Sequence, residues 1–221
     1  MTNVSGLIGP SVLSADYLEL GRQLVELETA GADYIHVDVM DGRFVPNISI
    51  GLPILEAVRR GTSLPIDTHL MIVEPEKWIQ AFAAAGSDSI TVHVEATPHL
   101  HRLVQEIRSS GVRASVAINP ATPLSAIEEI VPLVDQILVM TINPGSGGQK
   151  FLPECVDKIR RLRELTERVN PECVIQVDGG IAKGTIAIAA RAGASSFVAG
   201  TAVFSDSGSI AENIAVLRNA G

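Results

Sequence analysis

Histidine and aspartate recur in three short apolar stretches of this 221-residue chain. The stretches are residues 36–42 (HVDVMDG), 67–71 (DTHLM) and 176–180 (QVDGG). Each is typical of a short buried strand that runs into a loop. Two imidazoles and two carboxylates that arrive from three different strands could bind a metal ion, and they could also serve as a general acid and a general base.

Side-chain alternation indicates where these polar groups point. Residues two apart on a strand share a face, so His36, Asp38 and Met40 lie together and the β-branched residues between them lie on the other face. We expect the β-branched face to meet helices, which turns the polar face inward. The same pattern forms three further groups: Asp67 with His69 and Met71, His93 with Glu95, and Gln176 with Asp178.

A single inward histidine is more often a hydrogen-bonded core residue than a ligand. Buried carboxylates are rarer, because a charge taken out of water needs a partner, and four such converging groups favour a metal or acid–base centre. The roles of Asp67, His93 and Glu95 stay open: they are either structural or orient ligands by hydrogen bonding. Two histidines with two aspartates suit Zn²⁺, with Fe²⁺, Mn²⁺ and Co²⁺ as competitors.

The elements that position these groups follow from alternating apolar and amphipathic runs. Strands are predicted at residues 7–13, 34–40, 65–71, 89–95, 114–119, 136–142, 174–178 and 196–200. The clearest helices are predicted at residues 17–30, 74–85, 98–110, 152–169, 183–192 and 208–219.

Strict alternation of strands and helices predicts an α/β protein, either an open doubly wound sheet or a closed barrel. An open sheet would need a nucleotide fingerprint near its first turn, and residues 11–16 offer none. About eight strand–helix units in 221 residues favour a single (β/α)₈ TIM barrel that spans residues 1–221. The polar groups then lie at the carboxyl ends of the strands, where active sites of this fold are found.

Bulk composition excludes several classes of function. The net charge of −8 argues against nucleic acid as a partner, and it requires local donors for any anionic substrate. The chain has two cysteines, no uninterrupted apolar run of membrane-spanning length and no basic start followed by an apolar run. We therefore expect a globular cytoplasmic protein with no membrane partner.

Glycine-rich loops follow the last three predicted strands, at residues 143–149 (NPGSGGQ), 178–180 (DGG) and 199–201 (AGT). Glycine lets the backbone approach an anion closely and aim N–H groups at it. A phosphate site built from the last loops recurs in this barrel. A short helix that begins near Gly200 is expected to add its positive end to the site.

The chain also resembles the ribulose-phosphate 3-epimerase family from residue 10 to about residue 204. The block at residues 36–47 (HVDVMDGRFVPN) is the most specific match. The other matching stretches are residues 10–16 (PSVLSAD), 69–71 (HLM), 117–123 (AINPATP), 139–145 (VMTINPG) and 178–181 (DGGI).

This resemblance implies one divalent metal ion, held by His36, Asp38, His69 and Asp178, with Asp38 and Asp178 as the catalytic acid–base pair. Ser11 and His69 match positions that contact the substrate. The positions that match the phosphate-binding loops are Gly145, Ser146, Gly147, Gly148, Gly179, Gly180, Gly200 and Thr201. The methionines that match those lining the site are Met40, Met71 and Met140.

The activity that the resemblance implies is interconversion of D-ribulose 5-phosphate and D-xylulose 5-phosphate through an enediolate, by a homo-oligomer. Three positions depart from the family pattern: Ser146 stands where Phe is usual, Thr201 replaces Ser, and Thr68 replaces an apolar residue or Cys.

Ser146 keeps open a 3-epimerase of a hexulose 6-phosphate such as allulose 6-phosphate. A decarboxylase or aldolase on a similar barrel is a further alternative. Such enzymes commonly need a Lys where this chain has Met40, which argues against it. A non-catalytic binder of sugar phosphates is opposed by the intact set of histidines and aspartates.

Overall fold

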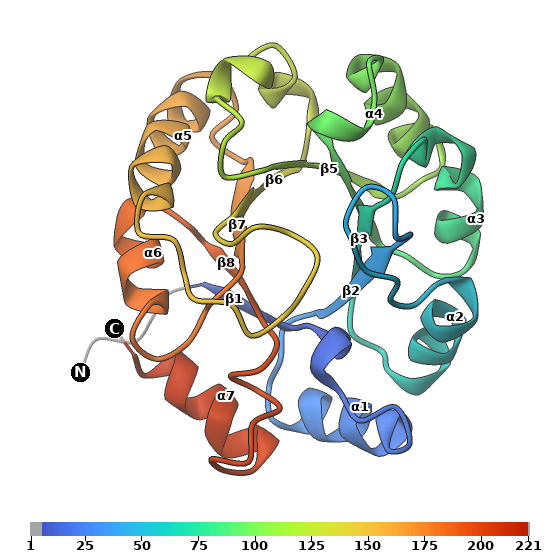
Figure 1. Ribbon diagram of the computed structural model, residues 1–221, viewed down its shortest axis with the longest axis vertical. Helices are drawn as coiled ribbons and strands as arrows, with labels where there is room; N and C mark the ends of the chain where they lie inside the picture. The colour runs from blue at the N-terminus through green and yellow to red at the C-terminus, as the bar shows by residue number, and fades with distance from the viewer. Residues whose placement is uncertain (1–5, 221) are drawn as a thin grey trace.

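The computed structural model describes residues 6–220, so both ends of the expected domain, residues 1–5 and 221, lie outside the described residues. Within residues 6–220, eight parallel strands form a barrel surrounded by seven α-helices (Figure 1). The strands are β1 (Leu7–Pro10), β2 (Ile35–Met40), β3 (Ile66–Met71), β4 (Ser89–His93), β5 (Arg113–Ile118), β6 (Gln136–Met140), β7 (Val174–Asp178) and β8 (Ser196–Ala199). This arrangement is the predicted (β/α)₈ barrel.

The helices follow the strands in alternation. They are α1 (Leu20–Thr29), α2 (Leu52–Gly61), α3 (Ile79–Ala84), α4 (Leu100–Ser109), α5 (Cys155–Val169), α6 (Ile186–Ala192) and α7 (Ile210–Arg218). Short 3₁₀ turns also occur, at η1 (Val12–Ser14), η2 (Pro75–Lys77), η3 (Val94–Ala96), η4 (Leu124–Ala126) and η5 (Val131–Leu133).

The core lies between the barrel and the helices, as the alternation predicts. Ile35, Val37 and Val39 of β2 are at most 6% exposed and belong to the large apolar cluster that the helices complete. α4 turns Leu103, Val104 and Ile107 into that cluster from one side of the helix. The residues that alternate with them on β2, His36, Asp38 and Met40, therefore face the barrel interior.

The barrel closes at the seam between β1 and β2. Strand pairing runs in the order β1-β8-β7-β6-β5-β4-β3-β2, and the first and last strands of this order are joined by a parallel bridge between Ser11 and His36. β1 itself ends at Pro10 because the chain turns into η1, where the Ser11 hydroxyl accepts a hydrogen bond from the Leu13 N–H. The predicted strand over residues 7–13 is therefore too long at its end.

Three other local features also differ from what the sequence predicted. Residues 52–61 form α2, which was not among the clearest predicted helices, and Pro53 occupies its first turn. The segment after Gly200 is a turn closed by hydrogen bonds from Val203 and Phe204 to the Gly200 carbonyl, so the expected short helix is absent among the described residues. Between β5 and β6, the described chain forms 3₁₀ turns in place of an α-helix.

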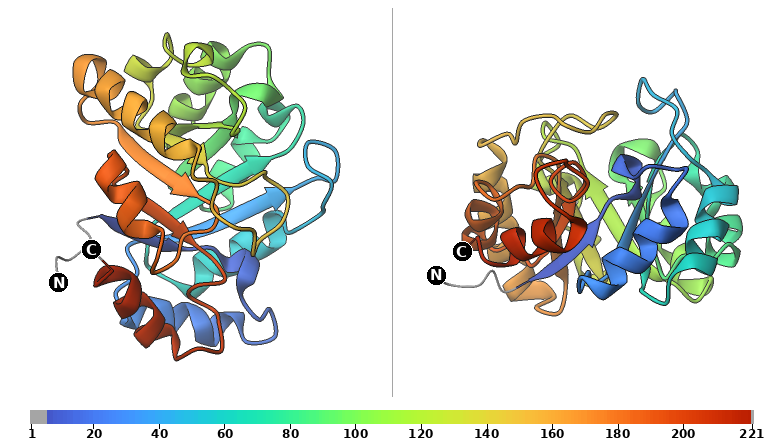
Figure 2. Two further views of the ribbon diagram at one scale, coloured as in Figure 1. Left: turned by 60° about the vertical axis from the view of Figure 1, so that its left-hand side comes forward. Right: turned by 90° about the horizontal axis from the view of Figure 1, so that it is seen from below.

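Two loops rise from the same end of the barrel. Figure 1 shows the loop between β6 and α5 in yellow, crossing the barrel mouth, and Figure 2 shows it on the same end as the loop between β2 and α2. This end carries the carboxyl termini of the strands. None of the helices in residues 6–220 has the length and apolar character needed to cross a bilayer.

Candidate active site and metal centre

Strands β2 and β3 bring the histidines and acids together by register. His36 pairs with Asp67 and Asp38 pairs with His69 as direct neighbours on the two strands. All four residues are buried, with exposed fractions between 0% and 5%. The inward orientation predicted by alternation therefore places two imidazoles and two carboxylates next to one another on the inner face of β2 and β3.

Asp178, at the end of β7, completes a cluster with His36, Asp38 and His69. One possible ligand atom from each of the four residues lies within 4.8 Å of the other three. Asp38 Oδ1 lies 3.2 Å from His36 Nε2 and 3.0 Å from His69 Nδ1. His69 Nδ1 lies 3.9 Å from Asp178 Oδ2. The sequence thus predicted which four side chains converge.

Each histidine uses its other ring nitrogen for a second buried partner. His36 Nδ1 lies 3.1 Å from Asp67 Oδ2, and Asp67 also accepts a hydrogen bond of 2.9 Å from the Gln176 amide. His69 Nε2 lies 2.9 Å from Nε2 of His93. Both imidazoles are held from behind, with one nitrogen directed at the cluster.

The surroundings push the pKa values of the two aspartates apart. Burial raises the pKa of Asp178 to about 7, and the negative charge of Asp38 adds to that rise. Burial alone would also raise the pKa of Asp38, but His36 and His69 outweigh it and lower that pKa below its ordinary value. Carboxyl groups separated in this way can take unlike roles in proton transfer.

The donor set fits a divalent cation. Burial disfavours a charged His36, yet Asp38 and Asp67 raise its pKa well above the usual value, and Asp178 also gains affinity for a proton. The cluster therefore attracts positive charge into a buried space. Nitrogen and carboxylate oxygen are the ligands that Zn²⁺ and its first-row neighbours take in proteins.

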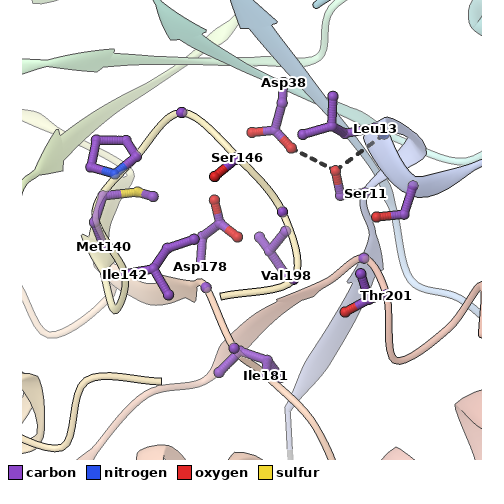
Figure 3. Close-up of a pocket in the computed structure, with 18 of the residues that line it drawn as sticks. Ser11, Leu13, Asp38, Met140, Ile142, Ser146, Asp178, Ile181, Val198 and Thr201 are labelled. Carbon is purple, nitrogen blue, oxygen red and sulfur yellow. Dashed lines mark hydrogen bonds between the residues drawn. The ribbon is translucent and has the colours of Figure 1, made fainter. Parts of the chain in front are cut away.

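A pocket opens directly above the cluster. In Figure 3, Asp38 and Asp178 face this pocket from different strands, and Ser11 donates a hydrogen bond of 2.5 Å to Asp38 Oδ2. Every loop position that was predicted to bind substrate lines the pocket: Ser11, Gly145, Ser146, Gly147, Gly148, Gly179, Gly180, Gly200 and Thr201. The three predicted methionines also line it: Met40, Met71 and Met140. His36 and His69 are fully buried and are not among the residues that line it, so the predicted contact of His69 with the substrate stays a prediction.

Glycine is required where the loop after β7 packs against the loop after β6. A Cβ on Gly180 would lie 2.3 Å from the backbone nitrogen of Phe151, and the φ of Gly180 is +66°. The backbone N–H of Thr141 donates to the carbonyl of Asp178 over 2.7 Å. These close approaches fix the end of β7, and with it the carboxyl group of Asp178.

The two loops over the mouth are joined to each other. The side-chain amide of Asn47 donates a hydrogen bond of 3.0 Å to the carbonyl of Gly145. Gly145 also packs against Val45 and Pro46, since a Cβ added there would lie 3.2 Å from Val45 and 3.3 Å from Pro46. The loop after β2 thereby contacts the β6–α5 loop, whose glycines line the pocket.

Sequence reasoning missed several residues of the site. Ser14, Leu13, Ile142 and Ile181 line the pocket but were not named as site residues, although each lies in a stretch that matches the family pattern. Asn47 lies inside the specific block of residues 36–47, and that membership was the signal that could have identified it. Lys158 is buried although it lies on an amphipathic helix, and no local pattern indicates this.

Comparisons with known proteins agree with the geometry. The model of the ribulose-phosphate 3-epimerase family matches residues 7–204. A ribulose-phosphate 3-epimerase of Synechocystis sp. is 50% identical over 215 residues, covering 96% of this chain and 93% of the relative. A ribulose-phosphate 3-epimerase of Bacillus subtilis is 50% identical over 201 residues, covering 90% of this chain and 93% of the relative. A chloroplastic ribulose-5-phosphate-3-epimerase of Arabidopsis thaliana is 50% identical over 200 residues, covering 90% of this chain and 71% of the relative.

Among solved structures, a mutant tryptophan synthase alpha-subunit from Pyrococcus furiosus matches with a TM-score of 0.67. It covers 100% of this chain and 97% of its own chain, at 17% sequence identity. At that identity the likeness supports the barrel fold alone.

Proposed function

The chain belongs to the ribulose-phosphate 3-epimerase family, an isomerase family that acts on carbohydrates, and we propose from that premise that it interconverts D-ribulose 5-phosphate and D-xylulose 5-phosphate. The two sugars differ only in configuration at C3, which lies next to the C2 ketone. The ketone makes the C3 hydrogen acidic. Loss of that proton gives an enediolate, and return of a proton to the opposite face inverts the carbon.

Inversion requires two proton-transfer groups on opposite faces of one carbon. Asp38 at the end of β2 and Asp178 at the end of β7 face the same pocket from different strands. We assign Asp38 to one face of the sugar and Asp178 to the other, with their roles exchanged when the reaction runs backwards. Their opposed pKa shifts support this assignment, because surroundings that differ in this way let one carboxyl act as base while the other acts as acid.

The residues proposed to hold the metal ion are His36, Asp38, His69 and Asp178, and Zn²⁺ suits this donor set. A bound divalent cation would act as a Lewis acid that offsets the negative charge developing on the sugar oxygens. The donor atoms of the cluster support this, since all lie within 4.8 Å of one another and two of the four residues, Asp38 and Asp178, line the pocket.

The glycine loops after β6, β7 and β8 are proposed to bind the phosphate group. They gather on one side of the pocket, where Gly145, Gly148 and Gly180 adopt positive φ values. Backbone N–H groups in such turns form anion-binding concavities without a charged side chain. This suits a chain whose net charge is −8.

Water exclusion is assigned to the two joined loops and the methionines. Asn47 links the loop after β2 to Gly145 in the loop after β6. Met40, Met71 and Met140 line the wall below. An enclosed apolar wall protects the enediolate from stray protonation and strengthens the electrostatic interactions inside.

The single observation that carries the proposal is the convergence of Asp38 and Asp178 on one pocket above the histidine cluster. The test is turnover of D-ribulose 5-phosphate by the purified protein, measured before metal removal, after chelation and after Zn²⁺ is returned. We expect conversion to D-xylulose 5-phosphate, its loss with the metal and its recovery. Lack of turnover by the metal-loaded protein would refute the reaction, and full turnover by protein shown to be metal-free would refute the metal dependence.

A second candidate is a 3-epimerase of a hexulose 6-phosphate such as allulose 6-phosphate. The observation that favours it is Ser146, whose small hydroxyl-bearing side chain lines the pocket. Paired measurements of kcat/KM with the five-carbon and six-carbon substrates decide between the two. A protein that binds both sugars and turns over neither would instead be a binder.

The domain and cellular context belong to the same proposal. We assign residues 1–221 to one catalytic domain that acts in the cytoplasm as a homo-oligomer. Two free buried cysteines, Cys155 and Cys173, accord with a reducing compartment. Light scattering on the eluting protein gives the number of copies, and a single unfolding transition is expected for the domain.

A further inference from the structure

We propose that His93 and Glu95 position the imidazole of His69, and that Lys158 anchors the loop that holds Glu95. The inference rests on the proposed function, because it takes His69 as a metal ligand. These residues form a line of hydrogen bonds that begins behind the cluster and ends on α5. None of the three is proposed to touch the substrate.

The first step is the contact between two ring nitrogens. His69 Nε2 lies 2.9 Å from His93 Nε2, and both side chains are fully buried. The two rings are nearly parallel, with an interplanar angle of 26°. Because one nitrogen of this pair must donate and the other must accept, the contact has a direction.

Glu95 sets that direction. Its Oε2 lies 3.1 Å from His93 Nδ1, and an ionised carboxylate can only accept. His93 therefore donates from Nδ1, which leaves Nε2 of its neutral ring as an acceptor. His69 then donates from Nε2, and the lone pair of its Nδ1 points at Asp38 and the cluster. That tautomer is the one a metal ligand needs.

Glu95 is itself fixed through its second oxygen. Oε1 accepts a hydrogen bond of 2.8 Å from the backbone N–H of Asn119 and another from the hydroxyl of Thr122. Both donors belong to the turn after β5, which is closed by a hydrogen bond of 3.1 Å from Thr122 N–H to the carbonyl of Asn119. With both oxygens engaged, the carboxylate cannot rotate away from His93 without losing donors.

Lys158 holds the same turn from the other side. Its ammonium donates to the carbonyls of Asn119, Pro120 and Thr122 over 2.9, 2.6 and 2.7 Å. Lys158 is only 6% exposed, so its three donors are all used within the protein. A helix on the outside of the barrel is thereby connected to the orientation of a ring at its centre.

The arrangement parallels the one behind the other histidine of the cluster. His36 meets a carboxylate directly, at Asp67, whereas His69 reaches Glu95 through one intervening imidazole. A carboxylate behind a ligating histidine fixes its tautomer and raises its basicity. The structure supplies such a carboxylate to both rings by two different routes.

Glu95→Gln tests the direction of the line, because it preserves shape and removes the acceptor-only character. The dissociation constant for Zn²⁺ is measured on metal-free protein by competition with a chromophoric chelator. We expect it to rise about 10- to 100-fold, the usual cost of losing such an outer partner. In the Zn²⁺-saturated variant, kcat should fall while KM for D-ribulose 5-phosphate stays unchanged, since the glycine loops are untouched.

The matched control is Glu28→Gln. Glu28 also accepts from a hydroxyl and a backbone N–H, those of Thr62 and Ser63, but it lies near the start of β3, at the opposite end of the barrel. We expect no change in the dissociation constant for Zn²⁺.

Two changes at His93 separate position from packing. In His93→Gln, the amide oxygen can accept from His69 and the amide N–H can donate to Glu95, so Zn²⁺ binding should be largely retained. In His93→Leu, both bonds are lost, and Zn²⁺ binding should weaken as in Glu95→Gln.

Lys158→Met should also weaken Zn²⁺ binding, but less than Glu95→Gln does, because the turn after β5 keeps its own hydrogen bonds.

Wild-type affinity in both Glu95→Gln and His93→Leu would overturn the inference and leave the proposed function standing. Should His93→Leu not fold, comparison of Glu95→Gln with Glu28→Gln decides the matter alone. A wild-type protein that binds no Zn²⁺ would instead refute the proposed metal site, and the inference with it.

Discussion

Ser11 and Asp38 are joined by a hydrogen bond of 2.5 Å across the seam where the barrel closes. The hydroxyl of Ser11 donates to Oδ2 of Asp38, while Oδ1 of the same carboxylate faces the two histidines. One oxygen is thus held by the residue that follows β1 and the other by the cluster. The orientation of the Asp38 carboxylate, which we assign to proton transfer, is thereby fixed through both of its oxygens.

Ser11→Ala removes this hydrogen bond without adding bulk. We expect kcat to fall about tenfold, since a hydrogen bond to a charged group contributes roughly 1.5 kcal/mol. Steady-state kinetics with D-ribulose 5-phosphate measure the effect. Ser125→Ala, at an exposed serine outside the pocket, serves as the control. Equal kcat values in the two variants would contradict a role for Ser11 in holding Asp38.

Asp178→Asn leaves Asp38 as the one remaining carboxylate of the pair. Epimerisation should be abolished, because no group then serves the second face of C3. In D₂O, we expect exchange of the C3 hydrogen to persist with one of the two sugars only, as followed by proton NMR. Metal content is determined in parallel, since the variant also loses a proposed ligand. Full epimerisation by the variant would disprove the two-base scheme.

Asn47→Ala separates the two loops over the mouth by removing the hydrogen bond to the carbonyl of Gly145. A neutral hydrogen bond contributes about 1 kcal/mol, so we expect KM for the sugar phosphate to rise about fivefold. The Tm should change little, because the loops lie outside the apolar core. A large fall in Tm with an unchanged KM would assign Asn47 to stability.

Gln176→Leu tests the support behind His36. The amide of Gln176 donates to Asp67 over 2.9 Å, and its loss leaves that buried carboxylate short of a donor. The expected cost is about 1–3 kcal/mol of stability, or a fall in Tm of roughly 2–12 °C. Calorimetry measures it. A Tm equal to that of the wild type would show that Asp67 needs no help from Gln176.

Glu95 predicts a specific pH dependence of stability. Burial alone would raise its pKa, but hydrogen bonds from His93, Thr122 and Asn119 outweigh it and lower the pKa from 4.5 to about 2. A lowered pKa means that the ionised group stabilises the fold above pH 4.5, and that this contribution is lost as the pH falls from 4.5 through about 2. The Tm gap between wild type and Glu95→Gln should therefore shrink across that range. A constant gap would argue against ionisation of Glu95 in the fold.

Strand periodicity was sufficient to predict the barrel and the cluster. Alternation placed His36, Asp38 and His69 inward because a period of two residues is a local property of a strand. Errors occur where the local pattern is overridden. Residues 11–13 continue an apolar run, yet the Ser11 hydroxyl captures a backbone N–H and turns the chain into a 3₁₀ segment.

The electrostatics of the site could not be predicted in the same way. The raised pKa of Asp178 depends on burial and on the charge of Asp38, a residue on another strand. The burial of Lys158 depends on three carbonyls supplied by a loop that precedes it in the chain. Both are properties of packing, and neither leaves a trace in spacing or composition.

The bridge between Ser11 and His36 makes one joint serve two purposes. The bridge closes the barrel between β1 and β2. Residues proposed to bind the cation and the sugar lie at the same place. Any ion or sugar that binds there draws the first and second strands together. A bound ion or sugar should therefore stabilise the barrel at the seam between β1 and β2, which this bridge closes. The Tm of the protein should then rise when the site is occupied.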